Sequence, residues 1–280
     1  MNDVSWLGEP IDARPLFGSE LEVLLRTLRG LRPAEWHKPA LPGWTVHDLA
    51  AHILGDLQGR LGDNRGAFLP GETLTAFIHR TNQEFVDRHA TDDPASLIDA
   101  LESAGTQVTE RFAAAELDAP ALGVSWAGVD PAPAWLDIAR EFTEYWTHRQ
   151  QIRHAVGLPT DPDPHALSTV LDTFIRALPH TLRHTTAPVG AQIEVIAEGE
   201  GGGRWTATAT ATATASARAG RWTLAAPPSG SPAASVFLDT ETAWRLCTRG
   251  IDPATALGRA HIQGEQRLAT AACQIVSVVH

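Results

Sequence analysis

The segment REFTEYWTHRQQIRHAVG, residues 140–157, has the pattern of one long helix and places Glu144 and His148 four residues apart. Residues at i and i+4 project from the same face of a helix, with Cβ atoms about 5–6 Å apart. A carboxylate and an imidazole at that separation can bind one metal ion. Three acid–histidine pairs in the chain have this spacing: Asp48/His52, Glu144/His148 and Asp161/His165. Spacing alone therefore also fits a solvated helix face.

A second element, GWTVHDLAAH at residues 43–52, makes His52 a candidate third ligand. Its Thr45 and Asp48 form the capping-box pattern with which many helices begin. His52 falls at the edge of the apolar face of the helix that starts there. Three protein ligands with one open position are typical of a catalytic metal site rather than a structural one.

The long helix carries its acid and its histidine at the rim of its buried face. The apolar arc of this helix includes Ile138, Phe142, Tyr145, Ile152 and Val156. At about 100° per residue, His148 lies roughly 40° from Ile152, and Glu144 lies roughly 40° further round. Both side chains therefore suit the interior of a helical bundle. Glu141 lies close to the same line and is a candidate hydrogen-bond partner for a metal ligand.

Composition and charge exclude several classes of protein. The chain has 280 residues, of which 43% are hydrophobic and 20% are charged, so it is globular, with one large domain or two ordinary ones. Its net charge of −11 argues against a nucleic-acid partner, which requires a basic face. There is no apolar run long enough to span a membrane, no signal-peptide pattern and no phosphate-binding glycine loop. We expect a cytoplasmic protein with no nucleic-acid or membrane partner.

The two cysteines, Cys247 and Cys273, lie in apolar segments near the C-terminus and are expected to be buried. The sequence has no Cys-x-x-Cys motif, which excludes a zinc finger or a redox pair of that type. Any thiol chemistry would therefore use a thiol supplied by a small molecule.

Helical periodicity dominates the first part of the chain, and strand alternation follows it. Helices are expected at 17–30, 45–59, 72–89, 94–115, about 133–157 and 165–183. Strands are expected at 192–198, 204–215, 221–225 and 234–239, with further helices at 240–249 and 265–275. The strand at 204–215 includes an unusual alternation of threonine and alanine. We therefore expect a helical domain over 1–187 and a smaller α+β domain over 188–280.

Three segments together resemble the mycothiol-dependent maleylpyruvate isomerase family over nearly the full chain. They are LPGWTVHDLAAH at 41–52, EFTEYWTHRQQIRH at 141–154, and a tail that runs from DTETAWRL at 239 to IQGEQRLA at 262–269. Members of this family join a DinB-like four-helix bundle, which binds a divalent metal, to a small C-terminal domain similar to sterol carrier proteins. The implied fold class is a helical bundle followed by a small α+β domain with an antiparallel sheet.

The resemblance also implies which residues form the site. It implies a divalent metal, usually zinc, held by His52, Glu144 and His148. It further implies arginines that hold an acidic substrate or the thiol cofactor, and Arg80 and Arg249 occupy candidate positions for this role. Arg245 competes with Arg249, and an arginine in so arginine-rich a chain also fits an ordinary surface charge.

The activity implied by the resemblance uses mycothiol as a thiol cofactor or cosubstrate. A thiol bound to the metal loses its proton, and the thiolate attacks a small, acidic electrophile. In an isomerase, addition to a cis double bond is followed by rotation and elimination. In a mycothiol S-transferase, the thiol stays attached. A non-catalytic metal- or ligand-binding protein is the remaining alternative, and the expected assembly is a monomer or homodimer.

Other histidines form weaker candidates. His180 and His184 also stand four residues apart, but Pro179 interrupts their helix and the segment leads into a linker. His37 and His47 are expected at the surface.

Overall fold

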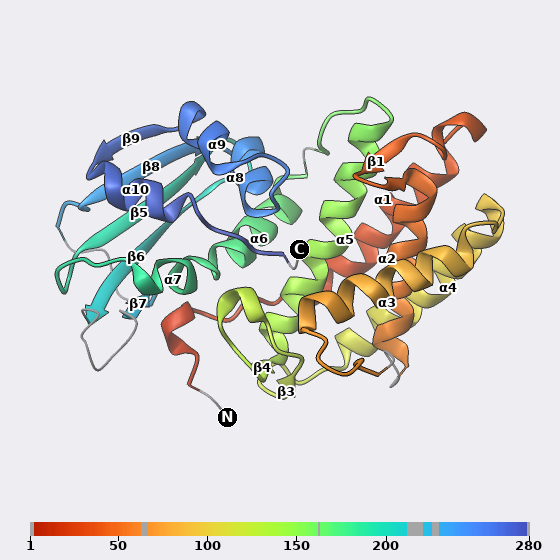
Figure 1. The fold of residues 1–280 in the computed structure, drawn as a ribbon, viewed down its shortest axis with the longest axis horizontal. Helices are drawn as coiled ribbons and strands as arrows, with labels where there is room; N and C mark the ends of the chain where they lie inside the picture. The colour runs from red at the N-terminus through yellow and green to blue at the C-terminus, as the bar shows by residue number, and fades with distance from the viewer. Residues whose placement is uncertain (1–2, 63–66, 162, 212–220, 226–229, 279–280) are drawn as a thin grey trace. The chain divides into compact units, whose positions relative to one another are not determined.

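The computed structural model describes residues 3–62, 67–161, 163–211, 221–225 and 230–278, and the chain forms two compact units. The bundle unit comprises Ala13–Ala115 and Glu141–Asp161. The sheet unit comprises Met1–Asp12, Glu116–Arg140 and Pro162–Val279. Figure 1 shows the elements in chain order.

The bundle unit is built from long helices. They are α1 (Phe17–Arg29), α2 (Val46–Leu61), α3 (Leu74–His89), α4 (Pro94–Ala113) and the larger part of α5 (Ala134–Ala155). Helix α2 packs against α3 and α4, and α1 packs against α4. A short hairpin of β1 (Pro39–Leu41) and β2 (Trp44–Thr45) leads into α2. The helical bundle expected from the sequence is confirmed.

The helices begin where the sequence provides capping residues. At the start of α2, the Thr45 hydroxyl accepts the backbone N–H of Asp48, and the Asp48 carboxylate accepts the backbone N–H of Thr45. This is the reciprocal capping box that the sequence predicts. Thr73 and Asp93 cap α3 and α4 with side-chain acceptors in a similar way. The Asp48 side chain therefore serves the end of its helix.

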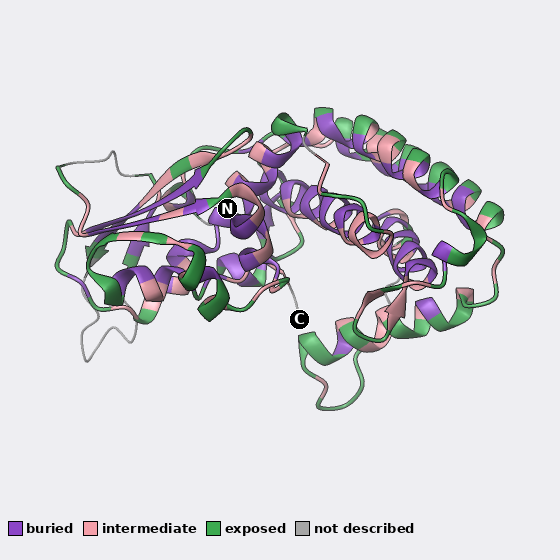
Figure 2. Ribbon diagram, turned by 90° about the horizontal axis from the view of Figure 1, so that it is seen from above, coloured by how far each residue is buried: buried purple, intermediate pink, exposed green. Residues whose placement is uncertain are grey.

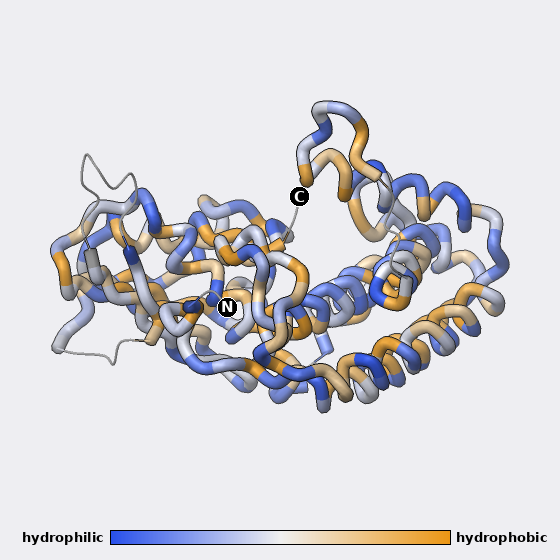
Figure 3. Tube along the Cα trace, turned by 90° about the horizontal axis from the view of Figure 1, so that it is seen from below, coloured by the Kyte–Doolittle hydropathy of each residue, from blue (hydrophilic) through white to orange (hydrophobic). Residues whose placement is uncertain are grey.

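The outer helices bury one stripe each, as their periodicity predicts. Helix α1 buries Phe17, Leu24, Leu25 and Leu28 on one side. Buried and exposed stripes alternate along the helices in Figure 2, and hydrophobic and hydrophilic positions alternate in the same way in Figure 3. The ring of Phe17 packs edge-on against the rings of Phe112, Phe142 and Tyr145.

Helix α5 is different, because from Glu141 to Gln150 every residue except Glu144 is buried. Buried polar groups need partners, and the charged residues of this stretch have them. Arg149 is 1% exposed and donates to Glu20 of α1 from Nε at 2.5 Å and from Nη2 at 2.9 Å. It also donates to Asp161 at 2.7 Å.

The sheet unit contains a five-stranded sheet in the order β7-β6-β5-β8-β9. The strands are β5 (Gln192–Glu198), β6 (Gly203–Ala211), β7 (Arg221–Thr223), β8 (Ala234–Asp239) and β9 (His261–Gly264). Strands β5 and β8 pair in parallel and the other neighbours pair antiparallel. The sheet is therefore mixed, because the chain returns from the β6–β7 side to pair with the opposite edge of β5. The part of the expected Thr–Ala strand at 212–215 lies outside the described residues.

Helices pack on this sheet to form an apolar core. They are α6 (Pro164–Ile175), α7 (Leu178–Thr181), α8 (Thr240–Cys247) and α10 (Gln266–Ala272), and α9 (Pro253–Arg259) packs against α8. The unit also contains the β3–β4 hairpin (Pro120–Ala121, Ala132–Pro133). Short 3-10 helices lie at Ser5–Leu7, Ser125–Ala127 and Leu182–His184 in this unit, and at Arg14–Leu16 and Pro33–Glu35 in the bundle unit. The sequence prediction did not include α9 and β9.

The division into units differs from the predicted boundary between residues 187 and 188. Helix α6 belongs to the sheet unit, because its Leu171 and Ile175 line the same apolar cavity as Val195 and Val236 of the sheet. That boundary remains a prediction about the folding domains. Among the described residues, the structure contains no helix with both the length and the hydropathy of a membrane span.

Candidate metal centre

Helices α2 and α5 each carry a row of polar side chains. On α2, the row is His52, Asp56 and Arg60, with one residue per helical turn. On α5, the row is Glu141, Glu144, Tyr145 and His148. Positions i, i+4 and i+8, or i, i+3, i+4 and i+7, share one helix face. The rows meet in opposite directions, since His52 contacts His148 and Arg60 contacts Glu141.

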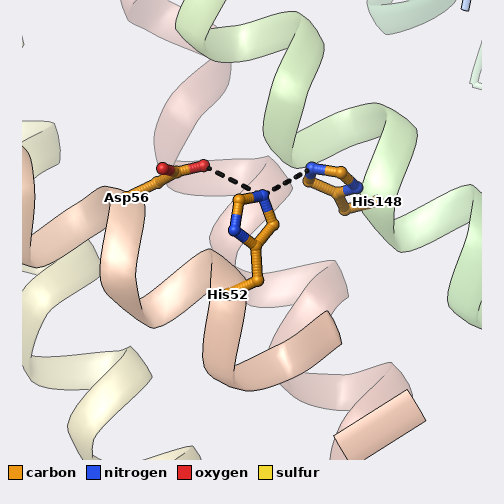
Figure 4. Close-up of side chains that lie close together, drawn as sticks. All are labelled: His52, Asp56 and His148. Carbon is orange, nitrogen blue, oxygen red and sulfur yellow. Dashed lines mark hydrogen bonds and ion pairs between the residues drawn. The ribbon is translucent and has the colours of Figure 1, made fainter. Parts of the chain in front are cut away.

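The two histidines point their Nε2 atoms at each other. These atoms are 3.2 Å apart, and the ring planes are inclined by 82°. Asp56 Oδ2 lies 3.4 Å from His52 Nε2, and Figure 4 shows the three side chains converging between the helices. The ligand atoms of His52, Asp56 and His148 all lie within 4.8 Å of one another, and no other group of three or more potential ligands occurs among the described residues.

These distances fit a shared ion. Two ligands bound at about 2.0–2.1 Å in a tetrahedral site lie roughly 3.3–3.4 Å from each other. The observed separations of 3.2 Å and 3.4 Å agree with this value. Two imidazoles and a carboxylate also form a donor set that zinc and other divalent transition metals accept. The residues present therefore fit a divalent metal.

The predicted ligand Glu144 lies beside this group. Its Oε2 is 3.5 Å from His148 Nε2, and its side chain is 19% exposed. The predicted histidines come together, and Glu144 contacts one of them. Asp56 was not among the predicted ligands, although it stands four residues after His52, the same spacing that singled out Glu144. An acid four residues after a histidine shares its helix face just as an acid four residues before it does, so both spacings indicate a candidate ligand pair.

A hydrogen bond orients the His148 ring. Its Nδ1 lies 2.8 Å from Oε1 of Gln151, which can only accept. Nδ1 must therefore carry the proton, and in the neutral ring Nε2 presents its lone pair to His52. Partners of this kind hold metal-binding histidines in the correct tautomer. In the chain without metal, facing Nε2 atoms 3.2 Å apart require a proton on one of them.

The electrostatics of the group reflect burial and crowding of acids. Burial lowers the pKa of His52, and the charge of Asp56 only partly opposes this. Burial raises the pKa of Asp56, and the charges of Glu141 and Glu144 raise it further. Burial alone would lower the pKa of His148, but its hydrogen bond to Glu144 and the Glu144 charge outweigh burial, so that pKa is raised. A cation bound among these groups would relieve the repulsion between the acids.

One acid of the row is balanced by an arginine. Glu141 accepts from Arg60 Nη2 at 2.5 Å and from the Tyr145 hydroxyl at 2.8 Å. The side chains of Arg60 and Glu141 are 7% and 2% exposed. Burial and the nearby Glu141 carboxylate both raise the pKa of Tyr145, so its hydroxyl stays protonated. The expected position of Glu141 near the site is consistent with these contacts, and its structural partner is Arg60.

Trp44 covers one of the histidines. Its ring centroid is 4.9 Å from that of His52, and its indole N–H donates to Gln83 of α3 at 2.9 Å. The β1–β2 hairpin thus places an aromatic ring over the imidazole. The ring limits the space in which His52 can rotate.

Residues 17–153 match the family described as the mycothiol maleylpyruvate isomerase N-terminal domain. This part of the chain belongs to that family. The chain also resembles two crystal structures of mycothiol-dependent maleylpyruvate isomerase, one of them a mutant. The mutant structure gives a TM-score of 0.52 at 14% identity and the other 0.47 at 15%; each comparison covers 87% of this chain and 91% of that chain. At this identity the likeness to the mutant structure shows the fold alone. No curated protein sequence matches the chain significantly.

The family match ends before the sheet unit's five strands, so their likeness to sterol carrier proteins remains a prediction. The metal ligands and the arginine roles that the resemblance implies are likewise predictions.

Arg80, a predicted substrate-binding residue, is held by acids of its own region. It donates from Nε and Nη2 to the two oxygens of Glu72, at 2.8 and 2.9 Å, and from Nη1 to Glu84 at 3.1 Å. Its Nη2 also donates to the Ala67 carbonyl at 3.0 Å. A substrate carboxylate would have to displace these partners.

Arg249, the second predicted substrate-binding residue, belongs to the sheet unit, whereas the histidine pair belongs to the bundle unit. Its Nη2 donates to the carbonyl of Gln274 at 2.9 Å, and its backbone has a φ of 56°. Burial lowers the pKa of its guanidinium. Its competitor, Arg245, lies 3.6 Å from Glu241.

Among the other histidines, His47 corrects one expectation. It is 8% exposed rather than at the surface, because its Nε2 lies 2.9 Å from the Asp92 carbonyl and its ring packs edge-on against Trp36. His37 is exposed, as expected. His180 and His184 do not belong to a group of three ligands among the described residues.

Proposed function

We propose that the protein is a metal-dependent enzyme that uses a small-molecule thiol, mycothiol, to act on an electrophilic small molecule. The reaction proposed first is cis–trans isomerisation of the kind named for its structural neighbours. The observation that supports this most directly is the pair of facing imidazoles with adjacent carboxylates, in a chain segment that belongs to the isomerase N-terminal domain family.

The residues proposed to hold the metal are His52 and His148, with carboxylate from the acids beside them. When bound, the ion would lower the pKa of a coordinating thiol, and the thiolate would supply the nucleophile for reversible addition to an activated double bond. This proposal retains the predicted set of His52, Glu144 and His148.

The protein's own contribution is to orient the ligands and limit access of water. Gln151 holds the His148 proton on Nδ1, so that Nε2 faces the site. Trp44 shields the His52 ring. Both imidazoles are largely buried, with side chains 8% and 11% exposed. Arg60 neutralises Glu141 beneath the site. Fixed and partly desolvated ligands of this kind favour electrostatic stabilisation of a developing charge.

A second reaction, transfer of the thiol to an electrophile, is supported by the surroundings of Arg80. The guanidinium that was expected to bind a substrate carboxylate already contacts Glu72 and Glu84. A substrate without a carboxylate would not need that arginine. The structure thus favours keeping a mycothiol S-transferase as the alternative, since addition of the thiol is common to both reactions.

The test is a mass-spectrometric assay of purified protein with mycothiol and maleylpyruvate, and separately with mycothiol and a neutral electrophile. An isomerase gives a product of unchanged mass that depends on catalytic mycothiol. A transferase gives a product heavier by one mycothiol and consumes it stoichiometrically.

The test variant is His148→Ala, which removes a proposed ligand. Its matched control is His37→Ala, which changes an exposed histidine. The proposal expects loss of turnover in the first variant and ordinary turnover in the second. Absence of both products with metal-loaded wild-type protein would contradict the proposed chemistry, as would undiminished turnover by His148→Ala.

A further inference from the structure

Two acids lie beside the histidine pair between α2 and α5, where a three-ligand site needs one. Asp56 Oδ2 is 3.4 Å from Nε2 of His52, and Glu144 Oε2 is 3.5 Å from Nε2 of His148. The two Nε2 atoms are themselves 3.2 Å apart. Each carboxylate therefore approaches the imidazole of its own helix, one turn away, and the two imidazoles meet between the helices.

We infer that Asp56 and Glu144 are both ligands, so that the site offers two imidazoles and two carboxylates to one divalent cation. This inference depends on the proposed metal binding and specifies its ligand set. It adds Asp56 to the three residues that the resemblance implies.

The geometry supports a direct role for Asp56. Its Oδ2 lies 3.4 Å from Nε2 of His52, a separation that two ligands of one ion can have. It also lies within 4.8 Å of His148 Nε2, on the other helix. An acid that merely orients a histidine would contact the nitrogen turned away from the ion. Asp56 instead faces Nε2, the atom that His52 presents to His148.

The charges of the row also favour a bound cation. Asp56, Glu141 and Glu144 carry three negative charges when ionised, and Arg60, which contacts Glu141 at 2.5 Å, carries one positive charge. A divalent cation beside the histidines would reduce the repulsion among these acids.

A set of two nitrogen and two oxygen donors has a chemical consequence. Additional carboxylate ligands favour harder ions with higher coordination numbers, such as Mn²⁺, Fe²⁺ and Co²⁺, over strictly tetrahedral Zn²⁺ binding. Four protein ligands and one exchangeable position would give a five-coordinate ion. Loss of Asp56 would leave three protein ligands and favour four-coordination.

The test loads Co²⁺ into wild-type protein, Asp56→Ala and Asp56→Asn, and measures stoichiometry, affinity and the visible absorption spectrum. Co²⁺ absorbs visible light much more strongly in four-coordinate than in five-coordinate sites. We expect weak absorption in the wild type. In Asp56→Ala we expect at least about 10-fold weaker binding, the lower end of the effect of perturbing a ligand's surroundings, together with stronger absorption. Asp99→Asn, which changes an exposed aspartate on α4, is the matched control and should resemble the wild type.

The two kinds of failure are distinguishable. If wild-type protein binds no Co²⁺, the proposed metal site fails and the inference with it. If the wild type binds one ion and Asp56→Ala keeps the same spectrum, Asp56 is not a ligand, and the inference alone is overturned even if the affinity falls. Circular dichroism identifies any variant that does not fold, and the near-isosteric Asp56→Asn then provides the comparison.

Discussion

His52 and His148 lie 96 positions apart in the sequence, yet their Nε2 atoms are 3.2 Å apart. Helical spacing predicts that Glu144 lies beside His148, because side chains at i and i+4 share a face in any tertiary fold, and the structure shows that contact. Spacing within one helix says nothing about which distant residue faces it. The sequence made His52 a candidate from its place on its own helix, and the family resemblance joined it to Glu144 and His148 as one ligand set. The same i to i+4 spacing could have identified Asp56, which stands four residues after His52.

The buried pair of Arg60 and Glu141 is expected to stabilise the bundle unit against loss of either partner. Arg60→Ala should lower the free energy of unfolding by about 3–5 kcal/mol, because it leaves the buried Glu141 carboxylate without its cation. The matched control is Arg29→Ala. It removes an ion pair with Glu102 whose side chains are 50% and 51% exposed, and it should cost no more than about 1 kcal/mol. Urea unfolding measures both, and equal losses would contradict the role of burial.

The two cysteines are expected to resist thiol reagents in the folded chain. Burial raises the pKa of Cys247 to about 12 and that of Cys273 to about 11, against about 8.5 for a free thiol. At pH 8 the native protein should react slowly with a maleimide, whereas the denatured protein should take up two labels. Rapid labelling of the native chain would contradict the burial of these residues.

The same pKa shifts set the sign of a pH effect. Because the folded-state pKa values are raised, the protonated thiols favour the folded state most fully below about pH 8.5, the unfolded value. This contribution is lost as the pH rises through about 11 and 12. Stability of the sheet unit should therefore fall over that alkaline range, and replacing both cysteines by alanine should reduce the pH dependence there.

Individual helices and strands were the most predictable level of the structure. The bounds of α1, α4, β5 and β8 agree with the sequence prediction to within two residues, because long periodic runs and capping residues mark them. The seven-residue helix α9 and the four-residue strand β9 are too short to show a period. The parallel pairing of β5 with β8 depends on which edge the chain returns to, and local alternation does not encode that choice.

Gly264 at the end of β9 illustrates a backbone requirement of one element. Its φ is 80°, and a Cβ at this position would meet the backbone carbonyl of Ala233. Gly264→Ala should therefore destabilise the protein by about 1–3 kcal/mol, the cost of a strained backbone residue. Gly258→Ala, in helix α9 with no atom within 4 Å of the added Cβ, should be neutral or slightly stabilising. Thermal unfolding compares them, and equal stability of the two variants would contradict this account.

At the scale of the whole molecule, the chain alternates between its two compact units. It enters the bundle unit at Ala13, leaves it after Ala115, and returns for Glu141–Asp161 within and after α5. The pattern of the sequence changes where the strands begin, and this change predicts one boundary near residue 187. It carries no information on which unit a helix packs against. Helix α6 looks like any amphipathic helix, and only the structure shows that its apolar face meets the sheet.

The return of the chain into the bundle unit is what brings α5 against α2, and with it the proposed ligands. The measurement that tests this account most directly is the divalent metal content of purified protein after dialysis, for wild type, His52→Ala, His148→Ala and the exposed-residue control His37→Ala. We predict about one ion per chain in the wild type and the control, and little or none in the other two. Full occupancy in His52→Ala and His148→Ala, or no metal uptake by the wild type, would contradict it.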